Sequence, residues 1–179
     1  MPPATLPIIG FAAYSGTGKT TLLTSIIPAL REKGLRVGLV KHAHHGFDPD
    51  VPGKDSYRLR KSGAVQTLVA SPLRQALFTE NEAPREPVLA DLLTQLDPAR
   101  LDLVLVEGFR GEGIPKVELH RPSLGHPLLF PEVPNIIAVA ADGPLETTAS
   151  PPPLLDLNRP EAVAAFVHAR WERGDLGGY

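Results

Sequence analysis

Apolar runs of strand length alternate with stretches of helical spacing along the chain. The expected strands are the runs at 6–13, 36–42, 65–70, 75–80, 101–109, 115–121 and 135–142. The expected helices lie at 20–33, 54–63, 86–96 and 161–173. Because strands that alternate with helices usually pair in parallel, the pattern predicts an α/β fold, a mostly parallel sheet flanked by helices with a short antiparallel edge element. No long linker divides the chain, so residues 1–179 are interpreted as a single domain with a frayed tail at 172–179.

The run 115–121 differs from the other expected strands because polar and apolar residues alternate in it. Its polar members are Lys116, Glu118 and His120, and Arg121 follows them. Such alternation is typical of a half-exposed strand. We therefore interpret this run as an edge strand, which in a dimer would pair with its twin.

Composition narrows the classes of function without selecting one. Eighteen Lys and Arg residues face 20 Asp and Glu residues, so no overall charge favours nucleic acid or an anionic membrane as the main partner. The absence of cysteine excludes disulfides, thiolate metal sites and thiol catalysis. The N-terminus does not resemble an export signal, and no apolar stretch approaches the roughly 20 residues that span a bilayer. We expect a cytoplasmic protein in which any anion site is local.

The stretch AYSGTGKT, which starts at Ala13, has the spacing of a phosphate-binding loop with alanine in the first glycine position. Glycines at 16 and 18 let successive backbone N–H groups approach phosphate oxygens, and the helix that follows directs its N-terminal donors at the same anion. In this pattern Lys19 reaches the β- and γ-phosphates and the Thr20 hydroxyl ligates Mg²⁺. The expected nucleotide-binding residues of the loop are Ser15, Gly16, Thr17, Gly18, Lys19, Thr20 and Thr21.

A protein with a phosphate-binding loop also needs an acid at the end of a neighbouring strand, to hold the Mg²⁺ shell or to orient water. Glu107 follows four apolar residues of the run 101–109 and precedes Gly108. Ligands bind at such strand ends in open α/β sheets. We expect Glu107 to act with Lys19 in catalysis and with Thr20 in metal binding; the alternative is a solvated residue at a strand end. Asp102, at the start of the same strand, is the weaker candidate.

Two further stretches make the chain resemble a known family. With the phosphate-binding loop, KHAHHGFDPDVPGKDSYRLRKSGA at 41–64 and LDLVLVEGFRGEGIPKVELHR at 101–121 are similar to the molybdopterin-guanine dinucleotide biosynthesis protein B (MobB) family. The likeness runs in the same order from about residue 8 to 141, and more loosely through the last helix. It implies a GTP-binding protein of the molybdenum cofactor pathway, a homodimer with slow GTP hydrolysis. It also implies a partner, the enzyme that attaches GMP to molybdopterin.

Asp142 follows the apolar run 135–142 and is the candidate for choosing the base. A carboxylate there accepts from both N1–H and the exocyclic amine of guanine, whereas adenine offers no such donor pair. A solvated turn aspartate is the alternative. No Asn-Lys-x-Asp run occurs in the chain, so the preference for guanine rests mostly on the resemblance.

The segment after the second expected strand is rich in histidine and acid. His42, His44 and His45 either bind a divalent transition metal or line an anion pocket. Asp55 either contacts Mg²⁺ or the attacking water, or caps the short helix that starts near Ser56.

A local basic cluster formed by Lys54, Arg58, Arg60 and Lys61 lies in the same region. It either meets the phosphate of a molybdopterin ligand or an acidic partner surface, or it is a solvated helix face.

The favoured function is Mg²⁺-dependent binding of GTP, with slow hydrolysis by in-line attack of water on the γ-phosphate. We expect slow hydrolysis because no arginine finger or water-positioning glutamine is assured; Gln66, Arg58 and Arg110 are candidates without a defined place. Three alternatives stay open: a small-molecule or nucleotide kinase with the same loop, a non-catalytic adaptor ordered by nucleotide, and a histidine-based metallochaperone.

Overall fold

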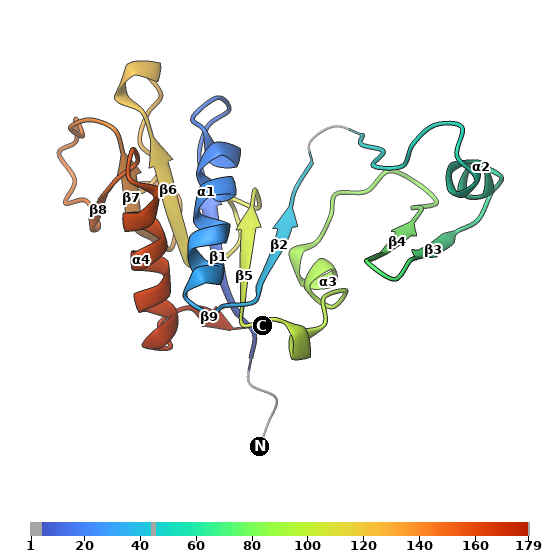
Figure 1. Cartoon of the computed structure of the whole chain (residues 1–179). Coiled ribbons are helices and arrows are strands. Elements are labelled where there is room, and N and C mark those ends of the chain that lie inside the picture. Colours follow the sequence, from blue (N-terminus) through green and yellow to red (C-terminus); the bar gives the residue numbers. More distant parts are fainter. Residues whose placement is uncertain (1–4, 44–45, 179) are drawn as a thin grey trace. The chain divides into compact units, whose positions relative to one another are not determined.

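The computed structural model describes residues 5–43 and 46–178 of the chain. These residues fall into two compact units, one within Met1–His42 and Val88–Tyr179 and the other within Ala43–Pro87. The first unit carries a large sheet and the second a small one (Figure 1). The single-domain interpretation of the sequence stays a prediction.

Seven strands form the large sheet: β1 (Pro7–Ala12), β2 (Val37–Lys41), β5 (Leu103–Glu107), β6 (Lys116–His120), β7 (Ile136–Ala141), β8 (Leu154–Asp156) and β9 (Gly177–Gly178). Their order is β2-β5-β1-β6-β7-β8, and each of these neighbouring pairs is parallel (Figure 1). The predicted α/β class with a mostly parallel sheet is confirmed. β9 lies within the tail that was expected to fray, and it pairs antiparallel with Pro7 and Ile8 of β1.

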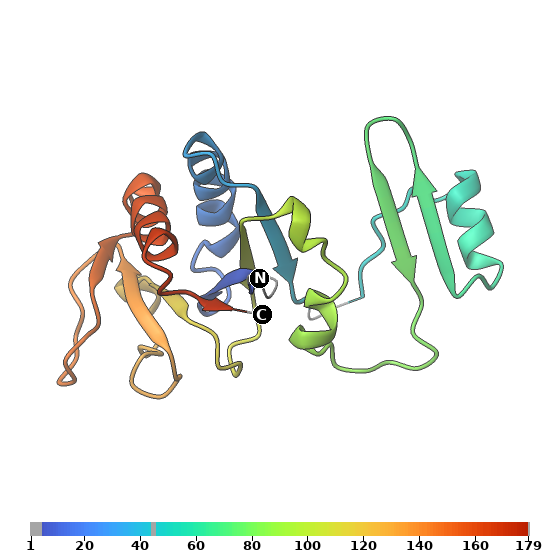
Figure 2. The same ribbon diagram turned by 90° about the horizontal axis from the view of Figure 1, so that it is seen from below.

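Apolar cores lie on both faces of the large sheet, which explains why its strands read as nearly continuous apolar runs. α1 (Lys19–Glu32) and α4 (Pro160–Glu172) pack side by side over one face (Figures 1 and 2). Ile9 and Phe11 of β1 are fully buried in the core on that face. Ile8 belongs instead to a second core, which α3 (Leu89–Leu93) helps to form.

The helix expected at 86–96 is shorter in the structure, because α3 begins only at Leu89. Pro87 disfavours helical backbone in the residue before it. No helix in the described part of the chain is both long and apolar enough to cross a membrane.

The prediction of an edge strand at 115–121 is wrong for β6. The sequence reads as an edge strand, but β6 lies inside the sheet between β1 and β7, and all five of its residues are buried. Its polar side chains have found partners: the Lys116 ammonium donates to the carbonyl oxygens of Glu112 and Ile114, at 2.5 and 2.9 Å. The Glu118 carboxylate accepts from two backbone N–H groups at 2.7 and 2.8 Å. Buried polar groups are tolerated when they are hydrogen-bonded, so alternation here does not mean exposure.

The second unit consists of a helix and a hairpin. α2 (Asp55–Lys61) precedes β3 (Gln66–Ala70) and β4 (Gln75–Thr79), which pair antiparallel in a sheet of their own. This small antiparallel sheet is separate from the large one. The side chain of Ser71 stabilises the turn between the strands, since its hydroxyl accepts from the N–H of Arg74 at 3.2 Å.

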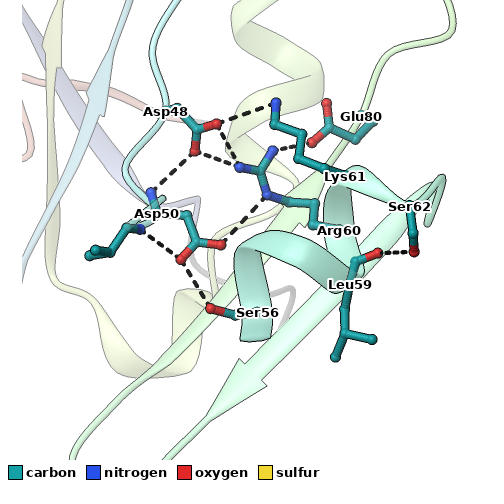
Figure 3. Close-up of polar contacts among 9 residues, drawn as sticks. Asp48, Asp50, Ser56, Leu59, Arg60, Lys61, Ser62 and Glu80 are labelled. Carbon is teal, nitrogen blue, oxygen red and sulfur yellow. Dashed lines mark hydrogen bonds and ion pairs between the residues drawn. The ribbon is translucent and has the colours of Figure 1, made fainter. Parts of the chain in front are cut away.

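An ion-pair network centred on Arg60 holds this unit together (Figure 3). The Arg60 side chain is only 5% exposed, and its guanidinium contacts Asp48 and Glu80, each at 2.5 Å, and Asp50 at 3.8 Å. Lys61 also pairs with Asp48, at 3.3 Å. The solvated-face interpretation of the basic cluster is therefore wrong for Arg60, which points inward because three carboxylates surround it.

The network makes the second unit sensitive to acid. Hydrogen bonds from Arg60 lower the pKa of Asp48 to about 2. A carboxylate whose pKa is lowered on folding stabilises the fold above its ordinary pKa of about 4, and that stabilisation is lost as the pH falls toward the folded value. We expect protection of the α2 amides to fall between about pH 4 and pH 2.

Asp48→Asn should produce the same loss of protection at neutral pH, measured by hydrogen–deuterium exchange of peptides from α2. Asp91→Asn is the matched control, because Asp91 is an exposed carboxylate of α3. Equal exchange of α2 in Asp48→Asn and in the wild type would show that the network does not stabilise this unit.

Candidate functional site

The loop from β1 to α1 lies at the carboxyl edge of the large sheet, where its conformation depends on two glycines. Gly16 and Gly18 have φ angles of 79° and 101°, in the left-handed region that residues with a Cβ avoid. The Thr17 side chain between them is buried and turns inward, with its hydroxyl donating to the Tyr14 carbonyl at 2.9 Å. Thr17 therefore fixes the shape of the loop, and its amide lies 3.5 Å from the same carbonyl.

Several backbone donors of the loop are without acceptors. Among the described residues, the N–H groups of Gly16, Gly18 and Lys19 make no hydrogen bond. Such successive free N–H groups at the N-terminus of a helix form an anion site, since the helix dipole adds positive potential there. α1 runs for 14 residues from this point, and its N-cap, Gly18, supplies no side-chain cap.

The Lys19 ammonium lies over the loop and completes the positive charge of the site. It donates to the carbonyl oxygens of Ala13 and Tyr14 at 3.1 and 3.3 Å. Burial lowers the pKa of Lys19, and the nearby charges of Lys41 and Arg110 lower it further while Glu107 opposes them. An anion bound here would favour the charged form of Lys19.

Glu107 lies where the sequence predicts, at the end of β5 beside β1. It pairs with Phe11 in the parallel register, two residues before Ala13 and the loop. The carboxylate is largely buried, and its Oε2 forms an ion pair with the Lys41 Nζ at 2.7 Å. The charge of Glu107 also acts on Lys19, so this carboxylate interacts electrostatically with two lysines. Asp102 lies at the other end of the strand and pairs with Arg36 at 2.8 Å, a structural role.

A tight turn follows Glu107 and carries the chain away from the sheet edge. Gly108 and Phe109 both have left-handed backbone, with φ angles of 93° and 53°. Phe109 is buried and its ring stacks on His42 at a centroid distance of 4.9 Å. After the turn, the Arg110 guanidinium lies 5.2 Å from the centre of the Tyr14 ring.

Arg121 joins the loop between β1 and α1 to Asp142, a link that the sequence did not predict. Its Nε donates to the Thr17 carbonyl at 2.9 Å and its Nη1 pairs with the Asp142 carboxylate at 2.5 Å. Asp142 directly follows β7 and so lies at the same sheet edge as the loop. The contact joins residues 104 positions apart, and no local pattern marks it.

A second connection reaches the loop from the segment after β6. His126 stacks on Tyr14 at a ring distance of 4.5 Å, and the buried Glu118 carboxylate holds that segment by accepting from the N–H groups of Leu129 and Phe130. Burial raises the pKa of Glu118 despite these two bonds. Burial has the opposite effect on the nearby base His120, whose pKa it lowers, while the charge of Asp142 raises that pKa.

Other predicted residues belong to the second unit or lie outside the described residues. Asp55 is exposed and belongs to the second unit, so its Mg²⁺ role stays a prediction. Its alternative role as a cap is wrong, because α2 begins at Asp55 and Lys54 is the N-cap. His44 and His45 lie outside the described residues, and the described part of the chain holds no cluster of three or more metal-ligating side chains.

The residues present fit a nucleoside triphosphate with Mg²⁺. Free N–H groups and the Lys19 ammonium match phosphate oxygens. The hydroxyl of Thr20, which is exposed at the start of α1, and the carboxylate of Glu107 are the oxygen donors that Mg²⁺ prefers.

Comparison with known proteins agrees with this description. Residues 8–142 match the family described as molybdopterin guanine dinucleotide synthesis protein B, MobB. The chain is 51% identical to the molybdopterin-guanine dinucleotide biosynthesis adapter protein of Escherichia coli (strain K12), over 90% of this chain and 91% of that protein. Identity is 43% to the adapter protein of the same name from Haemophilus influenzae, over 90% and 88%. The crystal structure of a MobB protein homolog from Bacillus stearothermophilus superposes with a TM-score of 0.67 at 31% identity, covering 93% of this chain and 98% of that one.

The turn after Glu107 generates a stability prediction. A Cβ at Gly108 would lie 2.7 Å from the Cβ of His42, and the φ angle of 93° is itself unfavourable for alanine. We expect Gly108→Ala to lower the free energy of unfolding by about 1–3 kcal/mol. In a thermal melt this corresponds to roughly 3–10 °C for a chain of this size.

Gly111→Ala is the matched control, because a Cβ there meets no atom within 4 Å and the backbone is not left-handed. A melting temperature of Gly108→Ala equal to that of Gly111→Ala would contradict the tight packing of the turn.

Proposed function

The chain belongs to the molybdopterin guanine dinucleotide synthesis protein B family, and we propose that it is a cytoplasmic GTP-binding adapter of molybdenum cofactor biosynthesis. The observation that carries this proposal is the loop with free N–H groups at Gly16, Gly18 and Lys19, over which the Lys19 ammonium lies. The relatives from Escherichia coli and Haemophilus influenzae are named as adapter proteins of molybdopterin-guanine dinucleotide biosynthesis. In this proposal, the partner of the chain is the enzyme that attaches GMP to molybdopterin.

The triphosphate binds in the loop, with its β- and γ-phosphates on the N–H groups and on Lys19. On binding, the ammonium exchanges the carbonyl oxygens of Ala13 and Tyr14 for phosphate oxygens, a stronger, charge-assisted contact. The proposed nucleotide contacts are those of the loop, Ser15 to Thr21. Arg121 supports this arrangement because it holds the Thr17 carbonyl.

Asp142 reads the guanine base in this proposal. It lies at the end of β7, two strands away from β1, so it is displaced from the phosphates along the same sheet edge. Arg121 pairs with its Oδ2, which leaves Oδ1 to accept from the base. Guanine offers N1–H and an exocyclic amine there, whereas adenine lacks this donor pair.

Hydrolysis is slow in this proposal and proceeds by in-line attack. A water oxygen forms the bond to the γ-phosphorus, the bond to the β–γ bridging oxygen breaks, and its electron pair leaves with GDP while the water proton passes to solvent. Thr20 and Glu107 would hold a Mg²⁺ ion, which when bound neutralises charge on the β- and γ-phosphates. Glu107 is a weak activator of water because Lys41 already neutralises it. Asp55 and a direct contact with molybdopterin stay predictions.

A homodimer through the hairpin of the second unit is part of the proposal. Leu68 and Leu77 lie directly opposite each other on β3 and β4 and are 63% and 52% exposed. An apolar pair this exposed in a two-stranded sheet favours burial against another chain.

The nucleotide proposal predicts distinct effects for three variants in calorimetric titrations with GTP, GDP and ATP in the presence of Mg²⁺. Lys19→Ala should weaken GTP binding about 100-fold, because a charge-assisted contact to phosphate is lost. Asp142→Ala should lose the preference for GTP over ATP. Arg121→Gln is its control, since it removes the same ion pair and should weaken GTP and ATP equally.

Unchanged preference for GTP in Asp142→Ala would exclude Asp142 as the base reader, and undiminished GTP binding by Lys19→Ala would refute the loop as the site. Transfer of labelled phosphate to a small-molecule acceptor, rather than release as free phosphate, would instead identify a kinase.

The dimer proposal predicts that Leu68→Glu combined with Leu77→Glu halves the mass measured by sedimentation equilibrium. Leu154→Glu is the matched control, because Leu154 is an equally exposed leucine of the first unit, at 57%. A dimeric double variant, or a monomeric wild type, would refute an interface through the hairpin.

A further inference from the structure

We propose that Arg110 is a further residue of the nucleotide site, one that contacts the γ-phosphate from within the same chain and accelerates its hydrolysis. This inference rests on the proposed binding of GTP. It assigns to Arg110 the part that an arginine finger plays in other phosphoryl-transfer proteins. Three observations carry it: the backbone before Arg110, the position of its guanidinium, and its lack of a carboxylate partner.

The backbone that leads to Arg110 is held in an unfavourable conformation. Phe109 carries a side chain and yet has a φ of 53°, directly after Gly108 at 93°. Left-handed backbone is unfavourable at a bulky residue and persists only where the surroundings enforce it. Here the buried Phe109 ring is anchored in the apolar core around α3 and stacks on His42. The turn therefore fixes the direction of the chain immediately before Arg110.

The guanidinium of Arg110 lies beside the phosphate-binding loop. It is 5.2 Å from the ring centre of Tyr14, the residue that opens the loop after Ala13. Its positive charge also acts on Lys19, whose ammonium contacts the Tyr14 carbonyl. An exposed arginine that rests on an aromatic ring keeps its N–H donors available for a ligand.

The charges around the loop are not balanced. The positive charges of Lys41 and Arg110 act on Lys19 together with the negative charge of Glu107, which is already paired with Lys41. Within the part of the chain that the structure describes, no carboxylate lies within ion-pair distance of Arg110. Arg121, the other arginine at this edge, is by contrast paired with Asp142. The surplus positive charge matches a triphosphate, and Arg110 is its uncompensated member.

The chemistry of the guanidinium suits the γ-phosphate. Two parallel N–H groups match two phosphate oxygens, and the fixed charge stabilises the negative charge that accumulates on the γ-phosphate and the bridging oxygen as the P–O bond to GDP breaks. GDP lacks the γ-phosphate, so a contact of this kind distinguishes GTP from GDP. Replacement of Arg110 should therefore affect GTP and leave GDP binding unchanged.

The test compares wild-type full-length protein with Arg110→Ala and Arg110→Lys. Affinities for GTP and GDP are measured by calorimetry with Mg²⁺, and hydrolysis is followed as single-turnover release of phosphate. Arg110→Ala should bind GTP about 10- to 100-fold more weakly, with a comparable loss in hydrolysis rate and unchanged GDP affinity. Arg110→Lys should restore part of the affinity, because it keeps the charge and loses the paired donors. Arg31→Ala, an exposed arginine in the last turn of α1, is the matched control.

Two results would overturn the inference while leaving GTP binding intact. One is a GTP-to-GDP affinity ratio and a hydrolysis rate in Arg110→Ala equal to those of the wild type. The other is an equal loss of GTP and GDP affinity, which would mean that Arg110 only packs on Tyr14. A wild-type protein that binds neither nucleotide would instead refute the proposed function itself.

Discussion

The candidate site depends on the parallel pairing of β1 with β5 on one side and with β6 on the other. Phe11 pairs with Glu107, and Ala12 with Glu118, so these strands end at the same edge of the sheet. The further pairing of β6 with β7 brings Asp142 to that edge as well. A shift of one residue in any of these registers would turn alternate side chains to the opposite face. The loop, its neighbouring acid and the proposed base reader are thus placed by one backbone constraint.

The two units differ in how fully carboxylates compensate their basic side chains. Arg60 in the second unit is surrounded by three carboxylates, and it acts as an internal cross-link that leaves no charge for a ligand. In the first unit, Lys19 and Lys41 share the carboxylate of Glu107. An incompletely compensated group of cations beside free N–H donors attracts a polyanion. The balance of charge, more than the number of basic residues, therefore separates a structural cluster from a candidate binding site.

The parts of the fold that were predicted correctly are those with a local cause. The turn between β1 and α1 follows from two glycines a few residues apart, and the place of Glu107 follows from the buried strand that ends there. The binding of a phosphate or a metal by these residues stays a prediction. β6 was misjudged because the partners of Lys116 and Glu118 are backbone groups of irregular segments, which leave no pattern in the sequence. The contact of Arg121 with Thr17 could not be predicted either, since it depends on the order of strands in the sheet.

In the proposed function, the loop between β1 and α1 holds the β- and γ-phosphates of a nucleotide. The most direct measurement is a crystal structure of the full chain with Mg²⁺ and a non-hydrolysable GTP analogue. The predicted result has phosphate oxygens on the N–H groups of Gly16, Gly18 and Lys19, with the Lys19 ammonium moved from the Ala13 and Tyr14 carbonyls to phosphate. A nucleotide bound elsewhere, with the Lys19 ammonium still on those two carbonyl oxygens, would contradict it.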